Sequence, residues 1–485
     1  MTIKDKTITG LLWSFIGTFS NLGINFIIGI ILARLLSPKE FGLLGLLTIF
    51  FALSQTLIDS GFGNALIRKK ECTQTDYSTV FFFNLTVGIA IYLVLFMNAG
   101  YISIFFKEPV LKPIVRILGL TIIISSLTLI QGTILTKRID FKLQSKISVV
   151  SSVLSGIIGI FMAYSGFGVW SLVFRNLSGA LFSSLFLWIW NNWRPIMVFS
   201  KTSFNEMFGF GSKLLISALI NSVYNNIYYL IIGKYFSVKE LGFYTRAEMF
   251  KNLPSQNIIG IISRVTFPVL AEIQGDKAML KAGYKRMITS MMLITFVLML
   301  GMAAIAEPMV ITLIGEKWRP SIFYLQMLCF VGMTYPLHAL NLNMLQVQGR
   351  SDLFLKLEII KKLLAIPTIV IGVLFGIKIM IAGMMVNSIL AYYLNSYWSG
   401  KFINYPMREQ IADIMPAFLL SLTIGILVFV AGYLLPFGYP LKLIIQTTIG
   451  GVLFFTLCES LKIDSYIYIK KLLIVKFTAF RNVRK

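Results

Sequence analysis

The sequence predicts an all-α membrane protein with about fourteen transmembrane helices. Hydrophobic residues make up 57% of the 485 residues and charged residues only 13%, and the mean hydropathy is +0.81. Apolar runs of about 20 residues, each long enough to cross a hydrocarbon core of roughly 30 Å, recur from end to end. Because these runs are continuous and do not alternate with polar residues, they argue against a β-barrel.

The predicted helices follow one another along the whole chain. The first apolar run is too long for a cleaved signal peptide and is interpreted as the first span. The eighth carries Arg246, Glu248 and Pro254, and as the least apolar it is expected to border water or protein rather than lipid. In order, the predicted helices are residues 8–33, 41–66, 79–104, 113–136, 145–164, 167–190, 207–232, 241–270, 287–314, 320–348, 354–376, 379–400, 414–435 and 440–461.

Basic residues gather in alternate connections between these helices. With the N-terminus in the cytoplasm, roughly 28 basic residues fall on the cytoplasmic side and about 10 on the other side. This asymmetry explains the net charge of +24 without a nucleic-acid partner, since no Lys/Arg-rich soluble domain exists to hold DNA or RNA. An even number of helices then returns the C-terminus to the cytoplasm.

An internal repeat organises the chain. Ala33–Gly42 reads A-R-L-L-S-P-K-E-F-G, and Gly233–Gly242 reads G-K-Y-F-S-V-K-E-L-G. Both segments lie where one long apolar run ends and the next begins. The repeat predicts two six-helix lobes of the same orientation, related by an axis along the membrane normal. The predicted divisions are 1–200 for the first lobe, 201–405 for the second, and 406–485 for a two-helix appendix with a basic cytoplasmic tail.

Polar stripes recur in the first helix of each lobe. In the first lobe the stripe is spaced by four and three residues, so its members share one helical face. Two interpretations stay open: contacts between helices, since Ser and Asn hydrogen-bond across membrane bundles, or the lining of a shared cavity, which the matching stripes favour. The stripes are Ser14, Thr18, Asn21 and Asn25 in one lobe and Lys213, Ser217, Asn221 and Asn225 in the other.

Charged side chains within the predicted spans are net positive. A charge near the bilayer centre costs at least roughly 2.5–3.5 kcal/mol, so it normally faces a cavity or a partner. For Lys251, an ion pair with Glu248 one turn away is the alternative to ligand binding. A cavity with spare positive charge attracts an anion, and arginine can hold phosphate with two hydrogen bonds. The basic residues predicted to bind substrate are Arg175, Lys213, Arg246, Lys251 and Arg264.

The acidic, histidine and cysteine residues suggest one candidate for ion coupling and no metal centre. Asp59 is a candidate for coupling to Na⁺ or H⁺, with a salt bridge as its alternative. The single histidine, His338, excludes a multi-histidine metal site and is expected to make a polar contact or relay a proton. The three cysteines are far apart in the sequence, so we expect neither a metal centre nor a cofactor.

Several motifs resemble the multidrug/oligosaccharidyl-lipid/polysaccharide (MOP) exporter superfamily. The opening segments L-L-W-S-F-I-G and I-L-A-R-L-L-S-P-K-E-F-G-L carry the resemblance, with I-D-S-G-F-G-N-A-L-I-R at Ile58–Arg68. Together with G-F-G-V-W-S-L-V at Gly166–Val173, they are most similar to the polysaccharide transporter branch, the Wzx-type flippases. The resemblance covers nearly the whole chain.

The resemblance implies a V-shaped pair of lobes around a central cavity in the inner (plasma) membrane. Such proteins move undecaprenyl-diphosphate-linked sugar units to the periplasmic leaflet for lipopolysaccharide or exopolysaccharide, in pathways with a polysaccharide polymerase and chain-length machinery. In related peptidoglycan-precursor flippases, cavity arginines bind the diphosphate. The first helix of this chain lacks that arginine-rich pattern and has Arg34 only at its far end, which argues against the peptidoglycan precursor.

Two other functions are alternatives to a flippase. A cation-coupled multidrug or metabolite exporter of the same superfamily would need essential carboxylates in the cavity, and the positive interior counts against it. A membrane-embedded ligase or polymerase would need catalytic side chains on an extramembrane loop, but the outer loops are short. The sequence contains no G-x-x-x-x-G-K-[ST] motif, so we expect a transporter that is not an enzyme and does not hydrolyse ATP itself.

Overall fold

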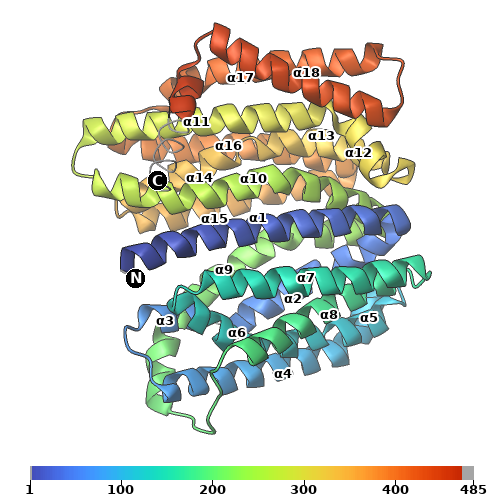
Figure 1. The fold of residues 1–485 in the computed structure, drawn as a ribbon, viewed down its shortest axis with the longest axis vertical. Coiled ribbons are helices and arrows are strands. Elements are labelled where there is room, and N and C mark those ends of the chain that lie inside the picture. The colour runs from blue at the N-terminus through green and yellow to red at the C-terminus, as the bar shows by residue number, and fades with distance from the viewer. Residues whose placement is uncertain (1–2, 60, 472–485) are drawn as a thin grey trace, which may run out of the picture. The chain divides into compact units, whose positions relative to one another are not determined.

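The computed structural model describes residues 3–59 and 61–471, which form helices and their connections with no strand among them (Figure 1). The chain divides into two compact units, Met1–Gly242 and Phe243–Lys485. These observations confirm the all-α fold class.

The first unit contains the six helical spans predicted for the first lobe, two of them as pairs of helices. The predicted span 113–136 is interrupted at Gly119, where a helix of eight residues ends. The helices are α1 (Ile3–Leu35), α2 (Pro38–Asp59), α3 (Phe62–Arg68), α4 (Gln74–Phe106), α5 (Leu111–Leu118), α6 (Leu120–Lys137), α7 (Phe141–Tyr164), α8 (Val169–Trp190) and α9 (Lys201–Tyr235).

The second unit begins within a helix that starts in the first unit, α10 (Val238–Glu272). Two predicted spans again consist of helix pairs, with breaks near Ile305 and Thr334. The other elements are α11 (Lys277–Ala304), α12 (Ala306–Ile314), the 3₁₀ turn η1 (Glu316–Trp318), α13 (Pro320–Gly332), α14 (Tyr335–Val347), α15 (Ser351–Phe375), α16 (Ile377–Ile403), α17 (Met407–Leu434) and α18 (Tyr439–Ser460).

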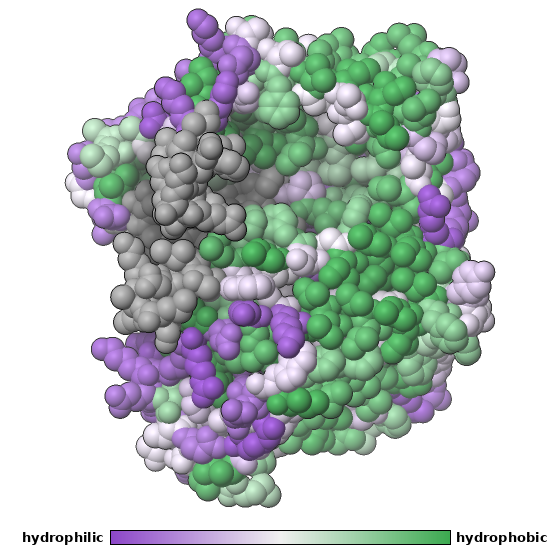
Figure 2. Space-filling model, in the orientation of Figure 1, coloured by the Kyte–Doolittle hydropathy of each residue, from purple (hydrophilic) through white to green (hydrophobic). Residues whose placement is uncertain are grey.

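Twelve helical segments of the described chain are long and apolar enough to cross a membrane. Figure 2 shows that hydrophobic side chains cover the middle of the helices on this face, while hydrophilic ones gather toward helix ends. Among the described helices of at least 18 residues, α10 and α15 fall outside the twelve, and their charged residues include Lys251 and Lys361. The chain is a multi-span membrane protein, and the total of about fourteen spans stays a prediction.

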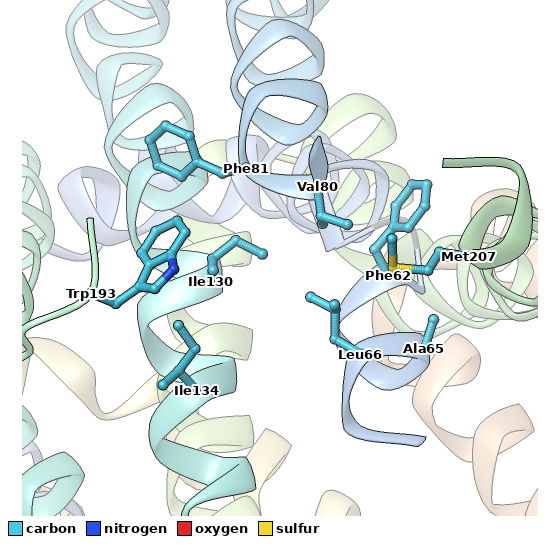
Figure 3. Packing of buried hydrophobic residues seen from close by; sticks show 9 residues of the cluster. All are labelled: Phe62, Ala65, Leu66, Val80, Phe81, Ile130, Ile134, Trp193 and Met207. Atoms are coloured by element: carbon cyan, nitrogen blue, oxygen red, sulfur yellow. The ribbon is translucent and has the colours of Figure 1, made fainter. Parts of the chain in front are cut away.

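A cluster of buried apolar residues joins α3, α4, α6 and α9 in the first unit (Figure 3). Phe62 and Leu66 of α3 are fully buried against Val80 of α4 and Ile130 of α6, and Trp193 follows α8 to close one side. Because lipid tails are as apolar as these side chains, close packing rather than hydrophobicity stabilises the membrane-embedded part of such contacts.

Small residues let α7 pack closely between α1 and α8. A Cβ atom at Gly17 of α1 would lie within 2 Å of the Ser145 hydroxyl, and one at Gly156 of α7 would collide with Ile28. On the other side, Gly159 leaves room for the aliphatic stem of Arg175. These are the close approaches that small residues permit between membrane helices.

The repeated sequence motif forms a reciprocal crossing in the first unit. An ideal Cβ atom on Gly42 would lie 1.7 Å from the carbonyl oxygen of Val238, and one on Gly242 would lie 1.9 Å from the carbonyl oxygen of Pro38. The first turns of α2 and α10 therefore meet backbone to backbone, each copy of the motif accommodating the other. Both positions need glycine because any side chain would overlap the facing peptide.

Helix α9, which the sequence assigns to the second repeat, packs against α2, α3 and α4. It therefore belongs to the first compact unit, which ends at Gly242. The predicted lobes 1–200 and 201–405, and the appendix 406–485, are defined by sequence repetition and stay a prediction.

Candidate functional site

A polar cavity lies between α1 and α7 in the first unit. Its volume is about 380 Å³. The whole predicted stripe of α1 lines it, with Gly17 and Leu22 beside the stripe. The lining residues of α7 are Phe141, Gln144, Ser145 and Ser148. The structure thus brings Ser14, Thr18, Asn21 and Asn25 together on one wall.

Hydrogen bonds connect the asparagines of α1 to serines of α7. Asn21 donates from Nδ2 to the Ser148 hydroxyl, and Ser152 donates to Asn21 Oδ1 at 3.2 Å. Asn25 Nδ2 donates to the Asn21 carbonyl at 2.9 Å and lies 3.5 Å from the Ser152 hydroxyl. The contacts between helices expected for the stripe are therefore present, and its members also line the cavity between α1 and α7. A cavity shared with the stripe of the other lobe stays a prediction.

Arg175 of α8 extends the polar contacts beyond these two helices. Its Nη2 donates to Asn25 Oδ1 at 2.7 Å, and its stem lies on Gly159. No carboxylate of the described side chains lies within ion-pair distance of this guanidinium. A neutral amide is thus the hydrogen-bond partner of a cation held within a membrane-spanning segment, and the positive charge stays uncompensated there. We call this set of α1, α7 and α8 residues the polar seam: Asn21, Asn25, Ser148, Ser152 and Arg175.

Sequence reasoning missed the α7 wall of the seam. Ser145, Ser148, Ser152 and Ser155 are spaced by three, four and three residues, which places them on one helical face. The same periodicity that identified the α1 stripe could have identified this one.

Lys251 of α10 lies in a different environment. Its side chain is only 2% exposed, and its ammonium lies 3.6 Å from Glu248 and 3.5 Å from the Tyr335 hydroxyl. The structure therefore shows the expected alternative, an ion pair one turn apart, which accounts for this buried charge without a ligand.

The other predicted ligands are placed only in part. Arg246 is half-buried, with Nη1 3.2 Å from Met249 Sδ. Asn221 and Asn225 are exposed on α9. Lys213 and Arg264 lie in α9 and α10, but their side chains are outside the described part of the structure.

Asp59 and His338, the two residues considered for proton or ion coupling, lie in different surroundings. Asp59 is exposed at the end of α2, and no described basic side chain lies within ion-pair distance of it. His338 is half-buried, with Nε2 3.1 Å from Ser388 Oγ and Nδ1 3.4 Å from Asn395 Nδ2, so the polar contact expected for it is present. Among the described residues, no group of His, Cys, Asp or Glu has the arrangement of a metal site.

Comparison with known protein families identifies the chain. Residues 31–323 match the family described as "Polysaccharide biosynthesis protein". The chain belongs to this family.

Curated relatives of this polysaccharide biosynthesis protein share about a quarter of its residues. The lipopolysaccharide biosynthesis protein WzxC of Escherichia coli (strain K12) is 27% identical over 451 residues, covering 90% of this chain and 89% of WzxC. The teichuronic acid biosynthesis protein TuaB of Bacillus subtilis (strain 168) is 26% identical, covering 88% and 89%. The succinoglycan biosynthesis transport protein ExoT of Rhizobium meliloti (strain 1021) is 26% identical, covering 65% and 64%.

Solved structures show the fold of this family member. The lipid II flippase MurJ in an inward closed conformation superposes with a TM-score of 0.76 at 15% identity, covering 95% of this chain and 100% of MurJ. An inward-facing multidrug resistance MATE family transporter of the MOP superfamily gives a TM-score of 0.62 at 17% identity, covering 79% and 96%.

These findings confirm three predictions from the sequence. The polysaccharide biosynthesis protein has the fold of MOP-superfamily transporters, and its resemblance to their polysaccharide branch is confirmed. It is a membrane transporter and not an enzyme. The roles of individual residues stay predictions.

Proposed function

We propose that this protein flips an undecaprenyl-diphosphate-linked oligosaccharide across the cytoplasmic membrane by alternating access. The observation that carries the proposal is the uncompensated guanidinium of Arg175, hydrogen-bonded at 2.7 Å to the neutral amide of Asn25. Relatives named for lipopolysaccharide and succinoglycan biosynthesis, and the fold shared with a lipid II flippase, support the same substrate class.

The polar seam addresses the physical difficulty of this transport. A hydrated, charged head group cannot cross hydrocarbon unless protein groups replace its water. The amides and hydroxyls of α1 and α7 offer donors and acceptors along a face of both helices, as Asn21 and Ser148 do. Arg175 would add a donor that can hold a phosphate with two parallel hydrogen bonds.

Further ligands belong to the second repeat in this proposal. Lys213, Arg246 and Arg264 would contact the diphosphate in the course of transport, and Asn221 and Asn225 would line the path as counterparts of Asn21 and Asn25. The exposure of Asn221 and Asn225 on α9 is compatible with such a lining. In a two-state cycle the cargo is exposed to one side of the membrane at a time.

The remaining features of the proposal concern energy, orientation and partners. No cofactor is required, and coupling to Na⁺ or H⁺ would act through Asp59, whose carboxylate is exposed and has no described basic partner. Both termini would be cytoplasmic, as the distribution of basic residues indicates. A polysaccharide polymerase and chain-length machinery would consume the product on the outer face.

The test replaces Arg175 in cells whose surface polysaccharide depends on this protein. Arg175→Gln should lower surface polysaccharide by at least about tenfold and cause the lipid-linked intermediate to accumulate, because a charge-assisted hydrogen bond to phosphate is lost. Arg175→Lys should retain part of the activity, since the charge remains but the planar fork does not.

Arg116→Gln is the matched control. Arg116 also lies within a predicted span, but it is not a residue of the seam, and its guanidinium lies 4.3 Å from the centre of the Phe96 ring. Its replacement should leave polysaccharide unchanged at equal membrane abundance. Normal polysaccharide in Arg175→Gln cells, with the protein present in the membrane, would contradict the proposal.

A further inference from the structure

A second cavity lies wholly within the second unit, away from the polar seam. Its volume is about 560 Å³, and α12, α13, α17 and α18 contribute to its walls. Gly432 and Tyr433 come from the last turn of α17, and Tyr439 and Lys442 from the first turn of α18. Because both helices are membrane spans that end here, the cavity lies near the depth of lipid head groups.

An ion-pair cluster fixes one wall of this cavity. Arg319 donates from Nη1 to Glu307 at 2.7 Å and from Nη2 to the Tyr439 hydroxyl at 2.9 Å, and its Nε bonds to Glu316. The hydrogen bond to Glu316, followed by those to Tyr439 and Glu307, raises the pKa of Arg319, so this cation stays charged. The cluster therefore holds α12, α13 and α18 together and leaves Glu307 as an acidic group on the cavity wall.

Gln446 supplies a buried acceptor that has no protein donor. Its side chain is 2% exposed, and its Nε2 donates to the Val428 carbonyl at 2.8 Å. Gly432 makes this position possible, since a Cβ there would lie 2.0 Å from Nε2. Gln446 lines the cavity, and its Oε1 is buried with no hydrogen-bond partner. Such an oxygen favours an occupant that donates a hydrogen bond.

Lys442 supplies a cation to the same cavity. Its ammonium makes no hydrogen bond or ion pair with the side chains that the structure describes. Lys442 lies three residues after Tyr439 and four before Gln446, so all three share one face of α18. A cation and an acceptor oxygen one turn apart are complementary to a ligand that carries an anion and a hydrogen-bond donor.

Apolar side chains border the cavity where it meets the lipid phase. Phe323 of α13 and Phe429 and Tyr433 of α17 line it and are exposed by 38%, 53% and 86%. Exposed aromatic and aliphatic surface at this position would contact acyl chains and not water. The occupant is therefore expected to enter from the bilayer.

We propose that this cavity binds a glycerophospholipid whose head group carries a phosphate and a primary ammonium. The phosphate pairs with Lys442, and an ammonium N–H donates to Gln446 Oε1 beside Glu307. Phosphatidylethanolamine has this chemistry. Phosphatidylcholine has the same charges but no N–H donor, and phosphatidylglycerol has the phosphate and hydroxyl donors but no cation to place beside Glu307. The bound lipid would connect α17 and α18 to α12 and α13.

The test is native mass spectrometry of the purified full chain with the three lipids, matched in acyl chains. Phosphatidylethanolamine should bind about tenfold more tightly than either of the others, because only it offers a phosphate to Lys442, an N–H donor to Gln446 Oε1 and a cation beside Glu307. Gln446→Leu should remove the preference over phosphatidylcholine, and Lys442→Met should weaken binding of all three lipids. Lys112→Met, an exposed lysine on α5 outside the cavity, is the control and should change nothing.

Thermal unfolding of Gln446→Leu guards against a folding defect, because this variant also loses the hydrogen bond from Nε2 to the Val428 carbonyl. Equal binding of the three lipids to the unmodified protein would overturn the proposal. Tightest binding of phosphatidylglycerol would also overturn it, in favour of an anionic lipid. These outcomes do not depend on polysaccharide transport, so this proposal and the proposed function can fail separately.

Discussion

The chemistry of the polar seam depends on the neutrality of Asn25. The Asn25 amide accepts a hydrogen bond from Arg175 at 2.7 Å while its Nδ2 donates to the Asn21 carbonyl. A guanidinium within a span costs at least roughly 2.5–3.5 kcal/mol unless it has partners. An amide offsets part of that cost by hydrogen bonding and leaves the charge available to an anion.

Replacing this amide with a carboxylate tests that argument. Asn25→Asp should place an ion pair at the position of the present hydrogen bond and neutralise Arg175 toward phosphate. We expect surface polysaccharide to fall by about tenfold while membrane abundance is unchanged, because the new pair satisfies the arginine within the fold. Immunoblots of membranes and quantitation of surface polysaccharide measure both quantities.

Asn98→Asp is the matched control for this substitution. Asn98 is an exposed asparagine of α4 whose Nδ2 bonds only to the Val94 carbonyl at 2.8 Å, with no arginine contact shown. The same change of charge there should leave transport unaffected. If Asn25→Asp cells made normal polysaccharide, Arg175 would not be the anion-binding group.

The residues of the seam were predictable from spacing within one helix or, for Arg175, from a charge within a predicted span, whereas their contacts were not. Asn21 and Asn25 follow from spacing within α1, and Ser148 and Ser152 of α7 would have followed from the same test. The contact between Asn25 and Arg175 joins residues 150 apart in the sequence. Such a contact depends on how α1, α7 and α8 pack, which local periodicity does not encode.

Among the helices, the crossing of α2 and α10 explains why the two copies of the internal repeat share a glycine at the same position. The repeated glycine stands where each helix begins, and each glycine faces the backbone of the other copy. The crossing is therefore a structural role for the motif, distinct from any role in binding cargo.

Adding a methyl group to either glycine should disturb this crossing. Gly42→Ala and Gly242→Ala would place Cβ at 1.7 Å and 1.9 Å from backbone oxygens, which cannot move aside as a flexible side chain can. We expect a loss of about 1–3 kcal/mol in stability for each variant. Thermal unfolding in detergent and the yield of monodisperse protein would measure it.

Gly23→Ala provides the comparison, because no atom lies within 4 Å of a Cβ at that position of α1. Helix propensity alone should then stabilise the variant by about 0.5–1 kcal/mol. Equal melting temperatures for Gly42→Ala and Gly23→Ala would show that the crossing is not tightly packed.

Helix positions were largely predictable, whereas helix interruptions were not. Each predicted apolar run corresponds to a helix or a pair of helices, because a span must satisfy its backbone hydrogen bonds internally. The breaks near Gly119, Ile305 and Thr334 lie inside apolar runs, where hydropathy gives no signal. Such breaks depend on packing against neighbouring helices.

At the scale of the whole molecule, composition predicts the class of protein, but local sequence patterns do not predict how the helices pack against one another. An apolar content of 57% in 485 residues leaves little alternative to a polytopic membrane protein. The packing of α9 against α2 is a tertiary fact that sequence repetition conceals, since the repeat places α9 in the second lobe. The charged helices α10 and α15 show why a count of apolar helices with few charges gives twelve in the described chain, where the sequence predicts about fourteen spans.

The central claim is that an uncompensated cation in a polar seam carries the diphosphate of a lipid-linked oligosaccharide through the membrane. Its most direct test is translocation in proteoliposomes of an undecaprenyl-diphosphate-linked oligosaccharide and of a neutral analogue that lacks the diphosphate. The account predicts that the diphosphate lipid is flipped and the neutral one is not, and that Arg175→Gln slows the former by about tenfold. Equal translocation of both lipids, or an unchanged rate in Arg175→Gln protein, would contradict it.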